Sequence, residues 1–378
     1  MTYTKSKKAD KKVEADLKII KEIILKEINL KAIILFGGFG HGNGSFKEED
    51  NKITPLNDYD IYLITKNKLK GDFLEKLGKK CSLAIGRGGL EFVEDFKKEY
   101  DEIKFFHVDF HNIQLKNLKR LYPTQRTFDL KTSQVIYGNP LILNEIPSLK
   151  ISKSDAIRLL FNKLDHFLIS EGNSKKIKSI YAIKGFVDLC SALLIFEEKY
   201  VSDSEKRNKI FQKLKVPTEL KRMVTKATNA KLYNGYSIPN VDNFFSQSKK
   251  WVEWTLKKIL KKHLNLKIDN WKEIVKITYK KLPYFYFDDY LGNSFYFPAQ
   301  YYLNIRFFLE GLRKKEFLIK SLIRWKDSGI IIALSLILYS FGEKEESLIY
   351  LKKLTGRLMP LKERILKLYS IYYLQKLI

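Results

Sequence analysis

The spacing of apolar and polar positions divides the chain into a first part that mixes helix with strand and a longer part that is helical. Apolar residues recur every three or four positions from Val13 to Ile28, which predicts an amphipathic helix. An apolar run from Ala32 to Phe36 stops at the glycine-rich segment Gly37–Ser45 and predicts a buried strand followed by a loop. Two further strands are predicted over Tyr59–Thr65 and Lys104–Ile113. This part therefore has the pattern of a domain that combines strands with helices.

Strand signals mostly end after Pro147. Ser152 or Ser154 caps a predicted helix with one apolar side, and a longer helix is predicted over Ile177–Lys199. At 378 residues the chain is long for a single compact domain. We expect a first domain over residues 1–147, a helical domain over 148–262, and a C-terminal helical region over 263–378.

The composition favours a folded, cytoplasmic protein. Apolar residues make up 45% of the chain, which is enough to build cores. The longest apolar run, Ile330–Phe341, is shorter than the roughly 20 residues that cross a bilayer, so no membrane partner is expected. The first twelve residues are basic and have no apolar segment of a secretory signal. Cys81 and Cys190 lie far apart, which excludes a disulfide framework and a paired-cysteine zinc site.

The net charge is +27, and such an excess is typical of proteins with a polyanionic partner. However, the chain has 59 Lys and only 11 Arg, and the Lys residues are spread along its whole length. Specific phosphate and base contacts usually rely on the bidentate fork of Arg. We therefore interpret the charge first as a solvated lysine-rich surface, with nucleic acid as a less favoured partner.

Three carboxylates are predicted to converge on neighbouring strands. Side chains alternate along a strand, so Asp58 and Asp60 share one face of the second strand. The same period places His107, Asp109 and His111 together on the third. Three carboxylates in one partly buried site repel one another unless a cation is bound, and oxygen ligands favour Mg²⁺ or Mn²⁺ over Zn²⁺. The two histidines are either structural or assist proton transfer.

The glycine-rich segment supplies a complementary feature. Glycines let backbone N–H groups surround a phosphate without side-chain interference, so Gly37 and Gly38 are candidates to hold a triphosphate beside the cation. In an alternative register, Gly44 and Ser45 form the phosphate-binding pair; it is disfavoured because that pair does not directly follow a strand.

Together these motifs resemble the nucleotidyltransferase superfamily that includes DNA polymerase beta and kanamycin nucleotidyltransferase. The resemblance rests on an apolar strand followed by Gly37-Gly38, on Asp58-Tyr59-Asp60, and on Val108-Asp109-Phe110 in a later strand. It covers roughly residues 13–145, and Val135–Pro140 resembles the segment that ends the catalytic domain in small members. Residues Lys175–Val201 resemble, more weakly, the helical domain of kanamycin-nucleotidyltransferase-like proteins. The sequence departs from the pattern of this superfamily at two places. Gly38 stands where Ser is more frequent, and the segment Gly44–Pro55 is longer than usual, which indicates a longer flap.

The resemblance implies a fold, a site and a reaction. The expected fold is an α+β catalytic domain with a mixed sheet and helices over residues 1–147, followed by the helical domain over 148–262, which closes the cleft. Asp58, Asp60 and Asp109 are the expected catalytic residues and hold two divalent ions, Mg²⁺ or Mn²⁺, with Asp109 also the expected proton acceptor. The expected nucleotide-binding residues are Gly37, Gly38, Gly42, Arg126, Lys131 and Lys184. Lys184 and Asp188 lie one helical turn apart and are otherwise an exposed ion pair.

The expected activity is transfer of a nucleoside monophosphate from an NTP, with ATP first, to a hydroxyl of a small molecule or a protein, with release of pyrophosphate. The sequence does not identify the acceptor. The alternatives are template-independent nucleotide addition to RNA, which the charge favours, and a non-catalytic nucleotide-sensing or toxin–antitoxin partner. The aromatic segment Tyr284–Tyr302 is interpreted as core packing rather than as a base-stacking surface.

Overall fold

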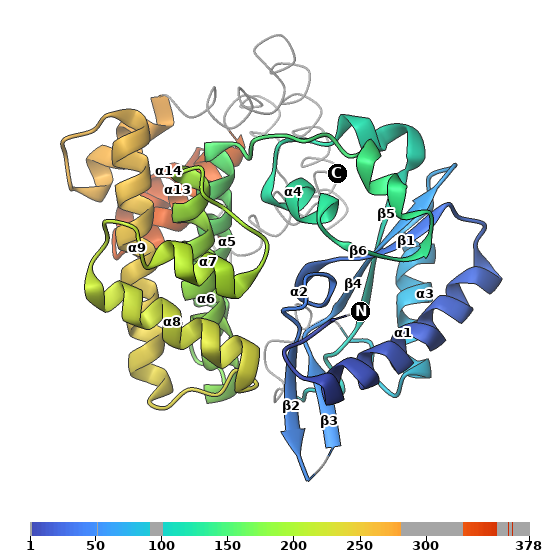
Figure 1. The fold of residues 1–378 in the computed structure, drawn as a ribbon. Helices are drawn as coiled ribbons and strands as arrows, with labels where there is room; N and C mark the ends of the chain where they lie inside the picture. The colour runs from blue at the N-terminus through green and yellow to red at the C-terminus, as the bar shows by residue number, and fades with distance from the viewer. Residues whose placement is uncertain are drawn as a thin grey trace.

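The structure is a computed structural model, and it describes residues 2–50, 52–90, 101–280 and 328–353, together with residues 362 and 365. The described residues form two lobes (Figure 1). The N-terminal lobe contains a four-stranded sheet with helices, and the second lobe is helical. The α+β architecture predicted from the sequence is confirmed.

The sheet of the N-terminal lobe has the strand order β5-β4-β1-β6. Its strands are β1 (Ala32–Leu35), β4 (Tyr59–Thr65), β5 (Val108–Gln114) and β6 (Gln134–Gly138). Strand β1 runs antiparallel to β4 and β6, whereas β4 and β5 are parallel, so the sheet is mixed as predicted. Because β4 and β5 are parallel, both strands begin at the same end of the sheet.

Helices cover both faces of this sheet. Helices α1 (Lys7–Glu27) and α3 (Gly71–Ala84) pack on the face that carries Ile33, Tyr59 and Ile61. The opposite face is covered by short elements, namely the 3-10 helices η2 (Leu115–Arg120) and η3 (Pro140–Glu145) and helix α4 (Gln125–Lys131). Strands β1 and β4 are buried on both faces and read as nearly continuous apolar runs, whereas β5 keeps the alternation of apolar and polar residues over its first half.

Two local predictions need correction, and a third gains detail. Strand β5 begins at Val108 rather than Lys104, because the side chain of Asp101 accepts hydrogen bonds from the backbone N–H groups of Ile103 and Lys104 and holds a turn there. The segment after β1 is not only a loop, since α2 (Gly37–Gly40) makes one helical turn. The expected flap is an antiparallel hairpin of β2 (Ser45–Glu49) and β3 (Lys52–Leu56).

The second lobe is built around one apolar helix. Its helices are α5 (Lys153–Ser170), α6 (Lys175–Phe196), α7 (Ser204–Phe211), α8 (Thr218–Tyr233), α9 (Val241–Leu264), α13 (Ser328–Ser340) and α14 (Lys344–Lys352), and residues 271–280 are also helical. Ser152 caps α5, as one of the two predicted alternatives. Helix α6 is long and apolar enough to span a membrane, but 83% of its apolar stretch is buried inside the protein, mainly against α5, α8 and α9. Its apolarity is therefore that of a core helix.

One hydrophobic core runs through the whole described part of the helical lobe. Helix α13, which contains most of the apolar run noted above, packs against α5 and α14. Helix α9 continues to Leu264, so no break in structure lies between residues 262 and 263. The aromatic segment Tyr284–Tyr302 lies outside the described residues.

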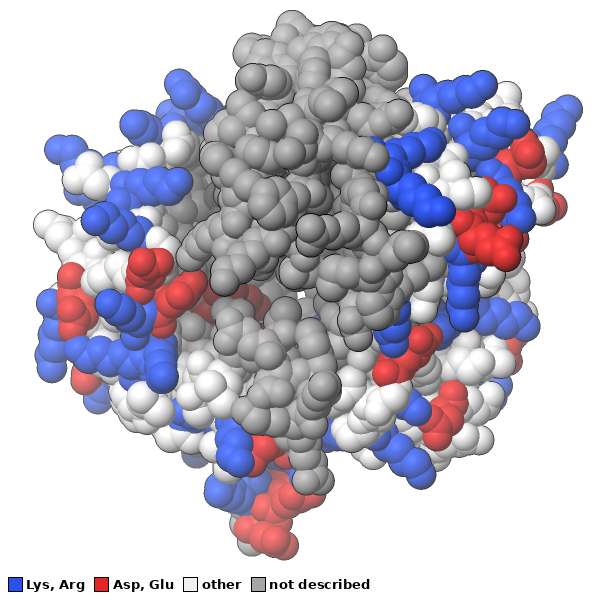
Figure 2. Space-filling view, turned by 180° about the vertical axis from the view of Figure 1, so that it is seen from behind, with Lys and Arg blue, Asp and Glu red and all other residues white. Residues whose placement is uncertain are grey.

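Basic side chains are distributed over both lobes. On the face seen in Figure 2, the Lys and Arg side chains of the described residues occur on the left and on the right of the view and are interspersed with acidic side chains. Many of the described lysines are paired: Lys8 lies 3.0 Å from Glu48, and Lys262 lies 2.8 Å from Glu197. Exposed pairs of this kind contribute little to stability, but they dilute the positive potential of the surface.

Candidate active site

A cavity of about 360 Å³ lies between the two lobes. Its N-terminal wall includes Gly37, Gly38, Asp60 and Asp109, and its helical wall includes residues of α6, α7 and α8. Polar contacts across the lobes fix this geometry. The Asn57 side-chain amide donates to the Tyr236 hydroxyl (2.7 Å), and the Ser204 backbone N–H donates to Asn43 Oδ1 (3.3 Å).

Two carboxylates meet on the floor of this cavity. Asp60 and Asp109 are register partners on the parallel strands β4 and β5, so their side chains leave the sheet at the same level. Burial raises the pKa of Asp60 to about 7, and the negative charges of Asp58 and Asp109 act in the same direction. The ionised carboxylates therefore repel one another in this site. A bound cation would offset that repulsion.

Asp58 has a different environment. It precedes β4, and its Oδ1 lies 3.0 Å from Nδ1 of His107. Burial opposes protonation of His107, but the hydrogen bond and charge of Asp58 outweigh it and raise the pKa of His107 to about 9. The pair lines a second, smaller cavity of about 80 Å³ rather than the larger one. The assignment of Asp58 as a metal ligand stays a prediction.

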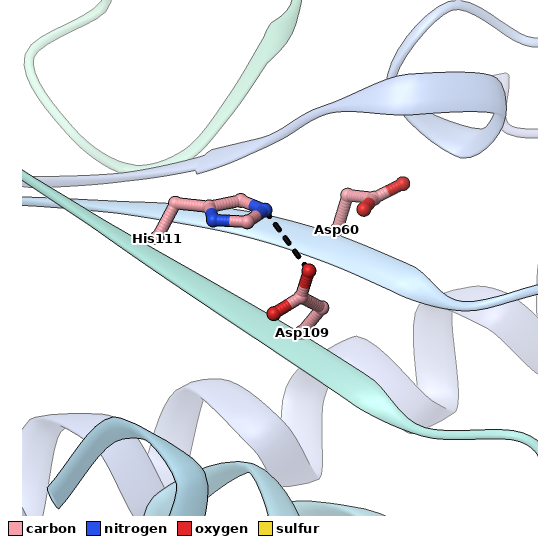
Figure 3. Close-up of side chains that lie close together, drawn as sticks. All are labelled: Asp60, Asp109 and His111. Carbon is pink, nitrogen blue, oxygen red and sulfur yellow. Dashed lines mark ion pairs between the residues drawn. The ribbon is translucent and has the colours of Figure 1, made fainter. Parts of the chain in front are cut away.

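His111 lies beside the carboxylates on the same face of β5. Its side chain is 2% exposed, and its Nε2 is 3.0 Å from Asp109 Oδ2 (Figure 3). The ligand atoms of Asp60, Asp109 and His111 all lie within 4.8 Å of one another. Two carboxylates and an imidazole so close together are a suitable donor set for a divalent cation.

The turn of α2 is packed directly against Asp60. Gly37 has φ +66°, a left-handed conformation that favours glycine, and a Cβ at this position would lie 2.5 Å from Asp60 Oδ2. Gly37 and Gly38 both line the cavity, whereas Gly44 packs against Phe39, and Ser45 is fully buried. The first glycine pair, and not Gly44-Ser45, is therefore next to the carboxylates.

Cationic side chains line other parts of the cavity. Arg126 from α4 is hydrogen-bonded to the Tyr62 hydroxyl, and Arg207 and Lys231 approach from α7 and α8. Burial lowers the pKa of Lys231 to about 8, and the charge of Arg207 adds to this effect. These three cationic side chains line the same cavity. An anionic ligand such as a polyphosphate would compensate for their charge there.

Three of the predicted nucleotide contacts lie elsewhere. The Lys131 ammonium donates to the backbone oxygen of Ile146 (2.6 Å), and Lys184 lines the smaller cavity. Gly42 does not line the larger cavity; a Cβ there would face the backbone of Thr2. Asp188 lines the larger cavity but pairs with Lys163 (2.8 Å) rather than with Lys184.

Sequence reasoning missed a polar network at the edge of the cavity. The Tyr200 hydroxyl donates to Asp129 Oδ2 (3.0 Å) and accepts from Arg207 Nη1 (2.8 Å), and Ser202 Oγ donates to Asp129 Oδ1 (2.6 Å). Of the segment Tyr200–Arg207, the sequence resemblance over Lys175–Val201 includes only Tyr200 and Val201. A run of polar residues directly after the very apolar helix α6 is the signal that singles it out.

We compared the chain with known proteins. No family model and no curated protein matches it. Among solved structures, it is similar to spectinomycin adenyltransferase from Enterococcus faecialis, solved with ATP and spectinomycin. The two chains are 15% identical; the match covers 65% of this chain and 99% of the other, with a TM-score of 0.43.

Proposed function

We propose that this chain is a metal-dependent nucleotidyltransferase that moves a nucleoside monophosphate from an NTP to a hydroxyl group and releases pyrophosphate. One observation carries the proposal: the glycine turn that can hold phosphate is in direct contact with the carboxylate pair that can hold a cation. Gly37 touches Asp60, and Asp109 stands beside Asp60 on the next strand. A triphosphate chelated to a divalent cation needs both features within a few ångströms.

The residues of the cavity divide the binding between them. The backbone of Gly37 and Gly38 faces the triphosphate, and Arg126, Arg207 and Lys231 offset its charge. Asp60 and Asp109 hold the metal. When bound, a divalent ion lowers the pKa of the acceptor hydroxyl and stabilises charge on the phosphates.

Asp109 is the proposed proton acceptor from the attacking hydroxyl. It is partly exposed in the cavity, with a side-chain exposure of 27%, so an acceptor can approach it. Because Asp109 is the register partner of Asp60, it would lie beside a cation held by the pair and within reach of an acceptor hydroxyl bound there. We propose a small molecule or a protein hydroxyl as acceptor, because the cavity between the lobes has a volume of only about 360 Å³ and the basic side chains are dispersed (Figure 2).

The acceptor class is tested by measuring pyrophosphate release. The protein is incubated with Mg²⁺ or Mn²⁺, each of the four NTPs in turn, and one of three fractions of a cell extract: a small-molecule filtrate, total protein, or total RNA. Release that depends on the filtrate or the protein supports the proposal. Release that depends on RNA and is lost after ribonuclease treatment selects RNA addition instead. NTP binding without release in any fraction favours a sensing role.

The matched control for this experiment is Asp60→Asn, which removes one ligand charge and keeps the shape of the side chain. It should fold and release no pyrophosphate. Release at the wild-type rate in that variant would move the reaction to another part of the chain.

A further inference from the structure

His107 directly precedes β5, and His111 lies within it. The two histidines contact different carboxylates. His107 contacts Asp58 at 3.0 Å, and His111 contacts Asp109 at 3.0 Å. His107 and Asp58 line the smaller cavity, while His111 lines the larger one with Asp60 and Asp109. In the larger cavity, the His111 imidazole, rather than the Asp58 carboxylate, therefore lies beside the carboxylate pair.

The position of His111 follows from the strand. Positions 109 and 111 alternate to the same face of β5, and the register places Asp109 opposite Asp60 on β4. The ring packs at 4.9 Å from the ring of Tyr62, which limits its rotation. Figure 3 shows one ring nitrogen directed toward the Asp109 carboxylate, with Asp60 on the neighbouring strand.

The distances suit ligands of a single ion. In octahedral coordination with bonds of about 2.1 Å, two neighbouring ligand atoms are separated by about 3.0 Å and two opposite ones by about 4.2 Å. The Nε2–Oδ2 separation of His111 and Asp109 is 3.0 Å, and all three ligand atoms lie within 4.8 Å of one another. Only small side-chain adjustments are needed to bring Asp60 into the same shell.

We propose that His111 binds a divalent cation directly through Nε2, together with Asp60 and Asp109. The inference rests on the proposed function only in taking a divalent cation as the group that these carboxylates hold. A nitrogen ligand moves the preference of a site away from Mg²⁺, which favours oxygen, and toward transition metals. The site consequently prefers Mn²⁺ to Mg²⁺, in contrast to the all-oxygen site expected from the sequence.

Pulsed electron paramagnetic resonance of the full chain with Mn²⁺ tests this directly. A coordinated imidazole gives a ¹⁴N modulation of the Mn²⁺ signal, whereas carboxylates and water give none. We expect the modulation in the wild type and its change to a ¹⁵N pattern when the protein is made with ¹⁵N-labelled histidine. This comparison needs no substitution, so it holds even if a variant at the buried position 111 folds poorly.

Variants then identify the histidine. His111→Gln should lose the modulation and bind Mn²⁺ about 10- to 100-fold more weakly, the usual effect of disturbing the shell of a metal site. His107→Gln and His263→Gln, the latter in α9, should keep the modulation. In competition with Mn²⁺, Mg²⁺ should displace it from the wild type less effectively than from His111→Gln.

Two results would overturn the inference, and they are distinguishable from failure of the proposed function. Mn²⁺ bound without nitrogen modulation shows an all-oxygen site and leaves the metal-dependent reaction standing. Modulation that persists in His111→Gln but disappears in His107→Gln assigns the ligand to the other histidine. Failure of the wild type to bind Mn²⁺, even with an NTP present, contradicts both this inference and the metal dependence of the proposed function.

Discussion

Replacing Gly37 with alanine should inactivate the site at little cost to the fold. Gly37 has φ +66°, and its added Cβ would lie 2.5 Å from Asp60 Oδ2. Ordinary van der Waals contact begins at 3.4 Å, so the carboxylate must move by about 0.9 Å. A side-chain oxygen can make that movement by rotation, which keeps the effect on stability small.

Gly86 provides the matched control. It has φ +75° in the turn after α3, and a Cβ there would meet nothing within 4 Å. Alanine at either position carries the same left-handed strain, which costs about 1 kcal/mol. Displacing a reacting group by about 1 Å can cost about 100-fold in rate, and this penalty falls on Gly37→Ala alone.

Both variants are compared by urea unfolding and by steady-state release of pyrophosphate. The account predicts equal losses of unfolding free energy, a near-normal rate for Gly86→Ala, and a rate about 100-fold lower for Gly37→Ala. The decisive comparison is the rate of pyrophosphate release by the two variants. If the rate of Gly37→Ala is within about threefold of the rate of Gly86→Ala, the claim that the glycine turn packs against a catalytic carboxylate is refuted.

Three further outcomes are expected. Asp109→Asn should keep the melting temperature within a few degrees and lower the transfer rate by orders of magnitude, since it removes a metal ligand and the proton acceptor; melting curves and pyrophosphate release check this. Burial raises the pKa of Asp165 in the folded protein to about 7. The folded state therefore binds a proton that the unfolded state has released, and the free energy of unfolding falls as the pH rises from about 4 through 7. Asp165→Asn should therefore gain up to about 2 to 3 kcal/mol relative to the wild type between pH 5 and pH 8 in urea unfolding; a constant difference would contradict the shift. RNA binding should be weak and lost near about 150 mM salt, and sub-micromolar binding there, with a log–log slope near −0.7 per contacted phosphate, would promote RNA to the favoured acceptor.

The sequence predicted those elements of the site that strand alternation determines. The pairing of Asp60 with Asp109 follows from two apolar strands of period two, and α1, β1 and β4 lie where the apolar pattern placed them. The start of β5 could not be predicted, because Asp101 holds a turn in a segment that is rich in aromatic residues.

Contacts between segments that are distant in the chain could not be predicted from the sequence pattern. Alternation put Asp58 on the same face as Asp60, but the hydrogen bond to His107 holds Asp58 at the smaller cavity. Likewise, Lys231 and Arg207 reach the larger cavity only because α7 and α8 pack beside α6. In a chain with 59 Lys, no local pattern distinguishes Lys231, which lines the cavity, from lysines that face solvent.

The central claim is tested most directly by following the label from an NTP that carries ³²P either at the α or at the γ position. The protein is incubated with each NTP, Mn²⁺ and the active extract fraction, beside an Asp60→Asn control. The account predicts that the α label enters the acceptor, that the γ label is recovered in pyrophosphate, and that neither occurs in the control. Transfer of the γ label to the acceptor, with the α label left in a nucleoside diphosphate, would show a phosphotransferase and contradict the account.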